Sequence, residues 1–318
     1  MPHRKDALPN MAAPKSEPAV PLATKSAGAG PKVSRSDDQL RASTKVRSFV
    51  SIGARSERGS EFLEYLTPQK IPEDLVLSVG VARTLFDVAQ EYRAADTIRR
   101  HHVPLRNRLL FCGPPGCGKT VTAEVFAREV GLPMMTAKLD ALVGSLLGET
   151  ASNLRKMFDA VERQSVVLFL DEFDALARSR NDPNEHSEMR RVVNNLLLMI
   201  ERYKGRGFVI AATNLETTLD GAILRRFDEV IEFRLPSALE IKRLFRLFTK
   251  NFPADFDVSA RVGQFSGKSH ADVERIFRRA IRRAVVKQRR LVSDEDMDYA
   301  LEAESMRDAA LQHITKGV

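Results

Sequence analysis

Apolar residues in this chain follow two patterns, short continuous runs and longer stretches with a helical repeat. Between residues 78 and 102 they recur at i, i+4, i+7 and i+11, which predicts one amphipathic helix that ends before Pro104. Further helical repeats occupy 121–130, 151–162 and 185–203. A continuous apolar run at 166–170 is typical of a buried strand, and short, mainly apolar stretches at 109–111, 132–139, 208–214 and 230–233 predict further strands. Strands that alternate with helices predict an α/β fold.

The two ends of the chain differ from this central region. Residues 1 to about 46 are rich in Pro, Ala, Ser, Lys and Gly and cannot bury enough apolar surface to order themselves. Apolar residues at 62–66 predict one short helix before Pro68. After residue 236 only helices are predicted, at 239–250, in the stretch that Ser269 would cap, and at 294–301. The expected parts are a disordered basic tail at 1–47, a short segment without an assigned role at 48–76, an α/β subdomain at 77–236, a helical subdomain at 237–306 and a C-terminal tail at 307–318.

Charge and cysteine content narrow the class of protein. The 318 residues carry a formal net charge of +8, which permits a nucleic-acid or acidic partner. Residues 1–50 hold nine basic and four acidic side chains, so +5 of that excess is explained by a solvated basic tail. The two cysteines, Cys112 and Cys117, lie in or beside one loop and form no disulfide framework, so we expect a reduced, cytoplasmic protein. We expect no membrane span and no signal peptide.

A phosphate-binding motif joins the strand at 109–111 to the helix at 121–130. The pattern G-x-x-x-x-G-K-[ST] is present as Gly113, Pro114, Pro115, Gly116, Cys117, Gly118, Lys119 and Thr120. Glycines let backbone N–H groups wrap a triphosphate, and the helix N-terminus adds partial positive charge. Lys119 would reach the β- and γ-phosphates, and the Thr120 hydroxyl would take a magnesium position. The motif therefore predicts a nucleotide site.

Polar side chains end two of the predicted strands downstream of this loop. Asp171 would hold the water shell of a magnesium ion, and Glu172 would orient or deprotonate the attacking water. Asn214 ends the strand at 208–214, where open α/β sheets place ligands, and would lie beside the γ-phosphate. Each of these residues also fits a plain polar strand end. The phosphate loop upstream favours the catalytic interpretation of the acids.

Two groups of basic residues each allow two interpretations. Arg225 and Arg226 fit exposed surface charge, or arginine fingers that neutralise a transferring phosphoryl group and are worth about 10³–10⁵ in rate. The helix after Ser269 carries a basic stretch that would bind nucleic acid, coat a solvated face or form a subunit contact. Its members are Arg275, Arg278, Arg279, Arg282, Arg283, Lys287, Arg289 and Arg290.

In order along the chain, GPPGCGKT, VVLFLDEFD, AATN and LRRFDEVIEF resemble the motifs of an AAA-type ATPase of the AAA+ superfamily, over roughly residues 75–305. The resemblance implies a P-loop NTPase fold, with a five-stranded parallel sheet and a C-terminal α-helical lid. It also implies a homo-oligomeric ring, usually hexameric, that binds ATP and Mg²⁺ at subunit boundaries. Arg225 and Arg226 would then act on the neighbour's nucleotide. The stretch 265–272 resembles the family's lid turn, which implies that Ser269, His270 and Ala271 lie near the adenine and ribose.

The resemblance is to stand-alone, single-module bacterial AAA ATPases, some of which are paired with a peptidase. The family's pore loop usually carries an aromatic, a hydrophobic residue and Gly, whereas this chain has Leu146 and Leu147 before Gly148. We expect an ATP-driven remodeller or unfoldase that contacts a protein substrate through these leucines or through the N-terminal tail. The alternatives are a nucleic-acid-linked AAA+ motor or loader, and a non-catalytic nucleotide-gated scaffold, against which Glu172 argues.

Overall fold

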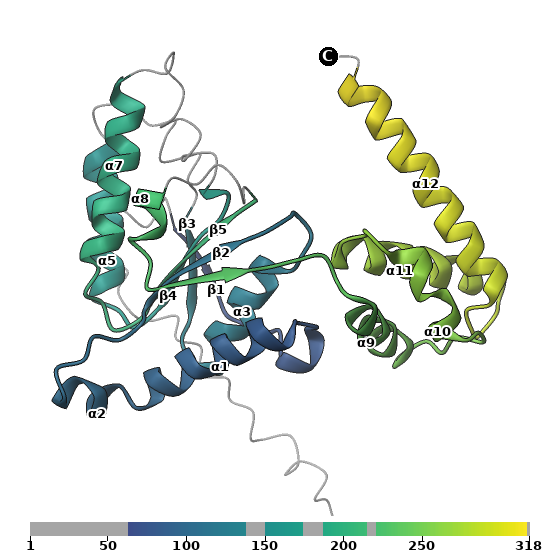
Figure 1. Cartoon of the computed structure of the whole chain (residues 1–318), viewed down its shortest axis with the longest axis horizontal. Coiled ribbons are helices and arrows are strands. Elements are labelled where there is room, and N and C mark those ends of the chain that lie inside the picture. The colour runs from purple at the N-terminus through teal and green to yellow at the C-terminus, as the bar shows by residue number, and fades with distance from the viewer. Residues whose placement is uncertain (1–62, 138–149, 174–186, 215–220, 317–318) are drawn as a thin grey trace, which may run out of the picture. The chain divides into compact units, whose positions relative to one another are not determined.

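The computed structural model describes residues 63–137, 150–173, 187–214 and 221–316. Six strands form one sheet in the order β1-β3-β4-β5-β2-β6 (Figure 1). Neighbours among β2 to β6 are parallel, and β1 runs antiparallel to β3. The α/β class and its parallel sheet are thus confirmed, with one strand more than the predicted five. The strands are β1 (Leu63–Leu66), β2 (Arg108–Cys112), β3 (Met134–Ala137), β4 (Val167–Leu170), β5 (Phe208–Thr213) and β6 (Glu229–Glu232).

The additional strand, β1, replaces the short helix predicted before Pro68. Leu63 pairs with Ala137 and Leu66 with Met134, so β1 lies at the edge of the sheet. Only Leu63 of its four residues is buried. The helix prediction was wrong because such a short segment has too few positions to reveal a period. Its extended conformation comes from hydrogen bonds to a strand about 70 residues away in sequence.

Helices cover both faces of the sheet (Figure 1), with α1 and α3 on one face and α5 and α7 on the other. Along β4, Val167 and Phe169 enter the core on the α1 and α3 side, and Leu168 and Leu170 enter the core on the other side. Burial of both faces explains the continuous apolar runs. The predicted helix at 78–102 is divided at Ala94. These helices are α1 (Val79–Arg93), α2 (Ala95–Arg100), α3 (Lys119–Glu129), α5 (Thr150–Glu162), α7 (Ser187–Arg202) and α8 (Gly221–Leu224).

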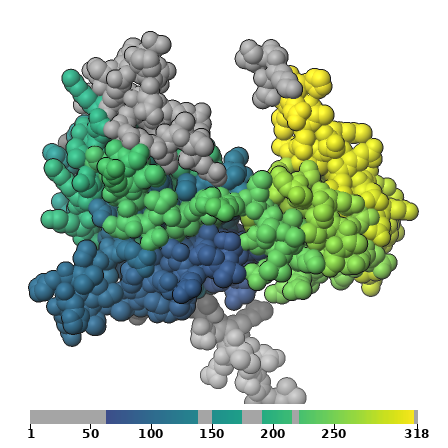
Figure 2. All heavy atoms as spheres, in the orientation of Figure 1, coloured from purple at the N-terminus to yellow at the C-terminus, as the bar shows by residue number. Residues whose placement is uncertain are grey.

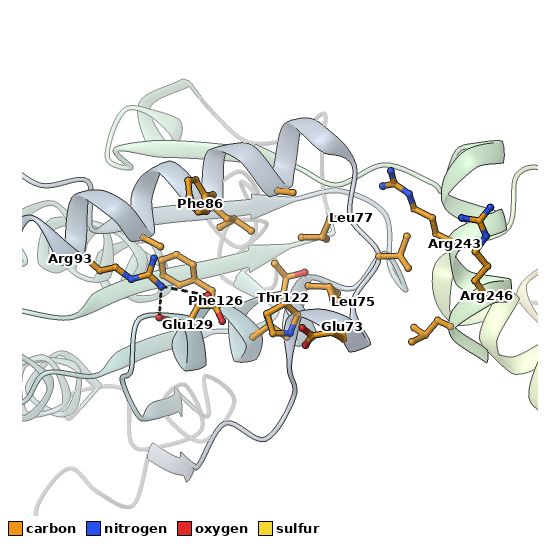
Figure 3. Close-up of a pocket in the computed structure, with 17 residues that line it drawn as sticks. Glu73, Leu75, Leu77, Phe86, Arg93, Thr122, Phe126, Glu129, Arg243 and Arg246 are labelled. Carbon is orange, nitrogen blue, oxygen red and sulfur yellow. Dashed lines mark hydrogen bonds and ion pairs between the residues drawn. The ribbon is translucent and has the colours of Figure 1, made fainter. Parts of the chain in front are cut away.

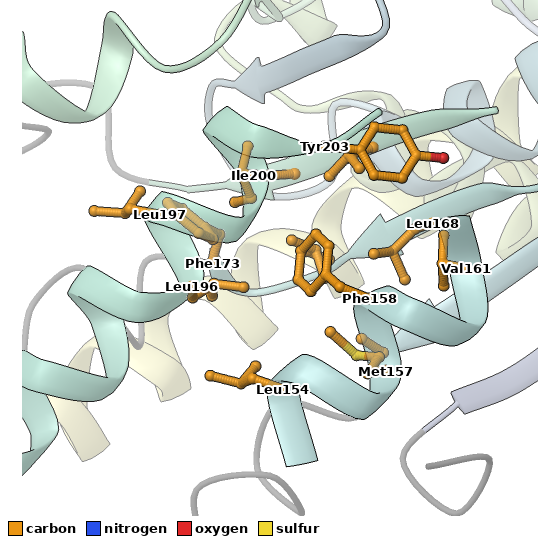
Figure 4. Packing of buried hydrophobic residues seen from close by; sticks show 14 of the residues in the cluster. Leu154, Met157, Phe158, Val161, Leu168, Phe173, Leu196, Leu197, Ile200 and Tyr203 are labelled. Carbon is orange, nitrogen blue, oxygen red and sulfur yellow. The ribbon is translucent and has the colours of Figure 1, made fainter. Parts of the chain in front are cut away.

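The core beneath α5 and α7 also holds the residue that follows the acidic pair. Figure 4 shows side chains of α5, among them Met157 and Phe158, together with side chains of α7 such as Leu196 and Ile200. Phe173 lies in this cluster and is fully buried. The strand end that carries Asp171 and Glu172 is therefore anchored in the hydrophobic core.

The chain after β6 is helical, as predicted, and packs around Phe245, Phe265 and Phe277. Ser269 caps α11, as predicted: its Oγ accepts from the N–H of Asp272, whose carboxylate accepts from the N–H of Ser269. Side chains of α11 and α12 pack directly together (Figure 2). α12 continues well beyond the predicted end at 301. These helices are α9 (Ala238–Thr249), α10 (Val258–Arg261), α11 (His270–Val286) and α12 (Asp294–Lys316).

Candidate nucleotide site

The phosphate-loop residues connect the end of β2 to the start of α3. Gly113, Gly116 and Gly118 have φ values of +143°, +74° and +89°, which glycine adopts without strain. A Cβ on Gly113 would lie 2.0 Å from the carbonyl oxygen of Phe233, so only glycine fits where the loop passes the end of β6. The first N–H groups of α3 have no acceptor within the helix and are available to an anion.

Lys119 is buried, with 7% of its surface exposed, and joins the loop to the end of β5. Its Nζ donates to the carbonyl oxygens of Gly113 (2.6 Å) and Pro114 (2.9 Å). It also donates to Oδ1 of Asn214 at 2.8 Å, across 95 positions of sequence. The fold thus brings Asn214 to the phosphate loop. A phosphate in the loop would compete with these oxygens for the ammonium charge.

Thr120 and Asp171 bring two hard oxygen ligands together. Thr120 Oγ1 donates to Asp171 Oδ2 at 3.1 Å. Mg²⁺ usually takes one or two protein oxygens and completes its octahedral shell with phosphate oxygens and water, so this pair fits the ion. Within the described ranges, no group of three or more His, Cys, Asp or Glu side chains forms another metal site.

Glu172 has an unusual backbone for a residue other than glycine. Its φ is +52°, in the left-handed region, and its side chain is exposed. Its N–H donates to Asp171 Oδ1 at 2.9 Å, and the next residue, Phe173, is fully buried. Strain of this kind persists only where surrounding contacts impose it, and it is frequent at functional sites. Here it occurs at the residue that the sequence assigns to water activation.

The lid turn contacts the phosphate loop directly. The N–H of Ala271 donates to the carbonyl oxygen of Gly116 at 3.0 Å, and a Cβ on Gly116 would lie 2.6 Å from Ser269 Oγ. Both ring nitrogens of His270 are buried and have no hydrogen-bond partner among the described residues. Burial lowers the pKa of His270, although the charge of Glu240 opposes this shift. The structure therefore brings the predicted loop and lid residues together.

A cavity of about 820 Å³ opens at this junction, with a size that suits a nucleotide base and ribose. Residues from the loop, from the segment before α1 and from the lid line it. Among them are Val76, Cys117, Gly118, Val121, Leu244, Phe248 and His270. Sequence reasoning missed Val76, Leu244 and Phe248, because nothing in their local pattern marks them as more than core residues.

A second, apolar cavity of about 610 Å³ lies between α1, α3, the segment 72–77 and α9 (Figure 3). Leu77, Phe86 and Phe126 line it, and Arg243 and Arg246 stand at one side. None of the predicted phosphate, magnesium or water-activating residues lines this cavity. It is therefore separate from the candidate catalytic groups.

The two candidate arginine fingers, Arg225 and Arg226, lie just after α8 and differ in their surroundings. Arg225 is exposed, whereas Arg226 donates through Nη1 to Glu201 Oε2 of α7 at 2.5 Å. Neither forms a hydrogen bond to the loop or the acids of its own chain within the described ranges. The pore-loop residues Leu146 and Leu147 lie outside the described residues.

The basic stretch of α11 is largely paired within the lid. Glu304 of α12, with 1% of its side chain exposed, forms ion pairs with Arg275, Arg279 and Arg307. Asp296, fully buried, pairs with Arg289 at 2.6 Å and with Arg283 at 3.4 Å. Arg275, Arg279 and Arg283 of α11 thereby hold this helix against α12. Arg289 follows the end of α11, and Arg307 belongs to α12 itself. The acids that pair with them could not be matched from sequence, because the crossing of the two helices decides the partners.

Known proteins resemble this chain over most of its length. The family model described as ATPase family associated with various cellular activities (AAA) matches residues 109–235. An uncharacterized AAA family ATPase of Sinorhizobium fredii is 48% identical over 253 residues, which are 80% of this chain and 77% of that protein. A putative 26S proteasome regulatory subunit homolog of Methanocaldococcus jannaschii is 36% identical over 61% of this chain and 54% of that protein. The ATP-dependent zinc metalloprotease FtsH 3 of Sphaerobacter thermophilus is 29% identical over 74% of this chain and 50% of that protein.

The chain spans about half the length of the last two relatives. In the described part of the chain, no helix combines the length and apolar character needed to cross a bilayer.

Proposed function

Because this chain belongs to the AAA family of ATPases and is an ATP hydrolase, we propose that it works as a homo-oligomeric ring that remodels or unfolds proteins. One observation carries this proposal. The loop, the acids and Asn214 converge on one site, while Arg225 is exposed and Arg226 is bonded away from that site. An exposed arginine that does not contact its own site is available to a neighbouring protomer. A hexamer is the size that the family resemblance implies.

Each group at the site receives a role in this proposal. Backbone N–H groups of the loop and Lys119 would hold the ATP phosphates, and Thr120 and Asp171 would hold Mg²⁺. The ion, when bound, neutralises phosphate charge. Glu172 would take a proton from the attacking water, with Asn214 beside the γ-phosphate. The adenosine would occupy the 820 Å³ cavity, which His270 lines, with Ser269 and Ala271 adjacent to it in the lid turn.

Two relatives support a protein substrate, since one is named a proteasome regulatory subunit homolog and the other a metalloprotease. We place the substrate contact at Leu146 and Leu147 or in the N-terminal tail, and the partner peptidase on a separate chain. A cytoplasmic location accompanies this proposal. The nucleic-acid alternative loses support, because most arginines of α11 are already paired with carboxylates of the lid.

Complementation between inactive protomers tests the shared site. Glu172→Gln retains its arginines and Arg225→Ala/Arg226→Ala retains its acids, so each alone should hydrolyse almost no ATP. Co-expression of the two should restore ATPase activity, and an unfolded model protein should stimulate it further. Co-expression of Glu172→Gln with Asp171→Asn is the matched control, because both lack an acid, and it should restore nothing. Full activity of the arginine double variant alone would contradict the proposal.

A further inference from the structure

The segment after α8, residues 225–228, carries two arginines that differ in exposure and in pairing. Arg225 is exposed, and among the residues that the structure describes no carboxylate pairs with it. Arg226 has 24% of its side chain exposed and forms an ion pair with Glu201 at the end of α7. Resting on the ring proposed above, we propose that Arg225 alone reaches the neighbour's nucleotide. Arg226 and Glu201 form a positioning pair that fixes the segment on which Arg225 lies.

A hydrogen-bond network holds this segment to the end of α7 and the start of β2. Arg108 Nη1 donates to the carbonyl oxygen of Glu201 at 2.7 Å, and Arg108 Nε donates to Asp228 Oδ2 at 3.0 Å. The same Asp228 oxygen accepts the N–H groups of Asn107 (3.1 Å) and Arg108 (3.0 Å). Arg226 and Asp228, on either side of Phe227, are thus bonded to the end of α7 and to the start of β2, respectively.

Phe227 anchors the segment from inside. Its ring is buried and makes an edge contact with Phe173, with 6.1 Å between ring centroids. Phe173 directly follows Glu172, so the segment is fixed to the strand end that carries the chain's own catalytic acid. With residues 226, 227 and 228 all held against the protein, Arg225 is left as the outward-facing guanidinium.

Reaching the nucleotide of a neighbouring protomer would cost the two arginines different amounts of free energy. Arg226 would have to leave Glu201, and its Nε, which is buried without a hydrogen-bond partner among the described residues, shows that the side chain is packed in place. Within the described ranges, Arg225 has no such carboxylate partner to leave. Catalytic charge stabilisation requires donors that are aimed before the reaction occurs. A clamped segment with one outward guanidinium supplies this arrangement.

The experiment compares five variants at positions 201, 225 and 226 by kcat, KM for ATP and complementation. Each change is also placed in the Glu172→Gln protomer and co-expressed with Arg225→Ala/Arg226→Ala, so that only its arginine donation is scored. Arg225→Lys should lower kcat by about 10³ with little change in KM, because a lysine lacks the planar fork and the loss is confined to the transition state. Arg226→Lys retains a cation for Glu201 and should lose less than tenfold.

The charge exchange Glu201→Arg/Arg226→Glu gives the sharpest result. Position 226 then cannot act as a finger, yet the ion pair is restored in reverse. The exchange variant should have a kcat, and an activity in complementation, at least tenfold higher than Arg226→Glu alone. Failure of the exchange to recover activity, together with an Arg226→Lys variant as inactive as Arg225→Lys, would overturn the division of roles.

Other outcomes separate this proposal from the one on which it rests. Full activity of Arg225→Ala would overturn the assignment of Arg225. Loss of complementation in every pair, the parent pair included, would instead reject the shared site itself, and the assignment with it. Circular dichroism and affinity for a fluorescent ATP analogue identify variants that fail to fold. The lysine variants, which preserve charge, then decide the question.

Discussion

Substitutions at Glu172 should separate the free-energy cost of its left-handed backbone from the role of its carboxylate in ATP hydrolysis. A left-handed conformation costs a residue with a Cβ about 1–2 kcal/mol, and glycine avoids this cost. The greater freedom of glycine in the unfolded chain offsets about 0.5–1 kcal/mol. We therefore expect the free energy of unfolding of Glu172→Gly to exceed that of Glu172→Ala by about 0.5–1 kcal/mol, with Glu172→Asn between them. In a unit of this size the gain raises Tm by about 1–4 °C.

Urea denaturation followed by circular dichroism, without nucleotide, measures this difference. Glu302, exposed within α12, provides the matched control. There glycine should be less stable than alanine by about 1 kcal/mol, so the sign is reversed. All variants at position 172 should lose about 10²–10⁴ in kcat and still bind ATP. If Glu172→Ala is at least as stable as Glu172→Gly while the control behaves as expected, the strain at Glu172 is refuted.

Two further predictions concern buried ionisable groups. Glu304→Gln should destabilise the lid by about 2–3 kcal/mol at pH 7, less than for a fully buried pair, because its arginines are 29–42% exposed. Burial opposes a lower pKa for Glu304, but hydrogen bonds from Arg275 and Arg307 lower it. The stabilisation by this carboxylate is therefore present above about pH 4.3 and is lost as the pH falls through the lower pKa of the folded state. Urea denaturation as a function of pH measures both effects, and equal stability of the variant and the wild type at pH 7 would contradict the prediction. Because burial lowers the pKa of His270, the unfolded chain binds the proton first, and stability should fall as the pH drops below about 6.5. His270→Asn should flatten this slope between pH 7.5 and 5.5 in thermal denaturation, and an unchanged slope would show that other groups cause it.

The sequence predicts those parts of the molecule whose chemistry is local. Ser269 caps α11 as expected because an N-cap and its Asp partner three positions later form one short motif. β4 was predicted because burial on both faces leaves a continuous apolar run. The meeting of Thr120 with Asp171 follows once the strands are parallel, since their carboxyl ends share one edge.

What the sequence does not reveal depends on pairing between distant residues. β1 is extended because β3 is beside it, and its own four residues carry no signal for this. Arg225 and Arg226 are equivalent in sequence, and only the position of Glu201 at the end of α7 distinguishes them. The left-handed φ of Glu172 is likewise imposed by its surroundings, because glutamate has no preference for that conformation.

The distribution of charge bears on where a partner binds. The sequence of residues 275–290 predicts one positive surface, but Asp272, Glu274, Asp296 and Glu304 pair with five of its eight basic residues. An arginine held by a carboxylate offers little net charge to a phosphate backbone, because counterion release depends on unneutralised cations. Most of the chain's net positive charge instead resides in residues 1–50, which carry +5 of +8. Attraction of an acidic partner should therefore depend on this tail rather than on the lid. The Ala271 N–H bonds to the Gly116 carbonyl, so under the proposed function the lid would close the nucleotide site while the tail would select the partner.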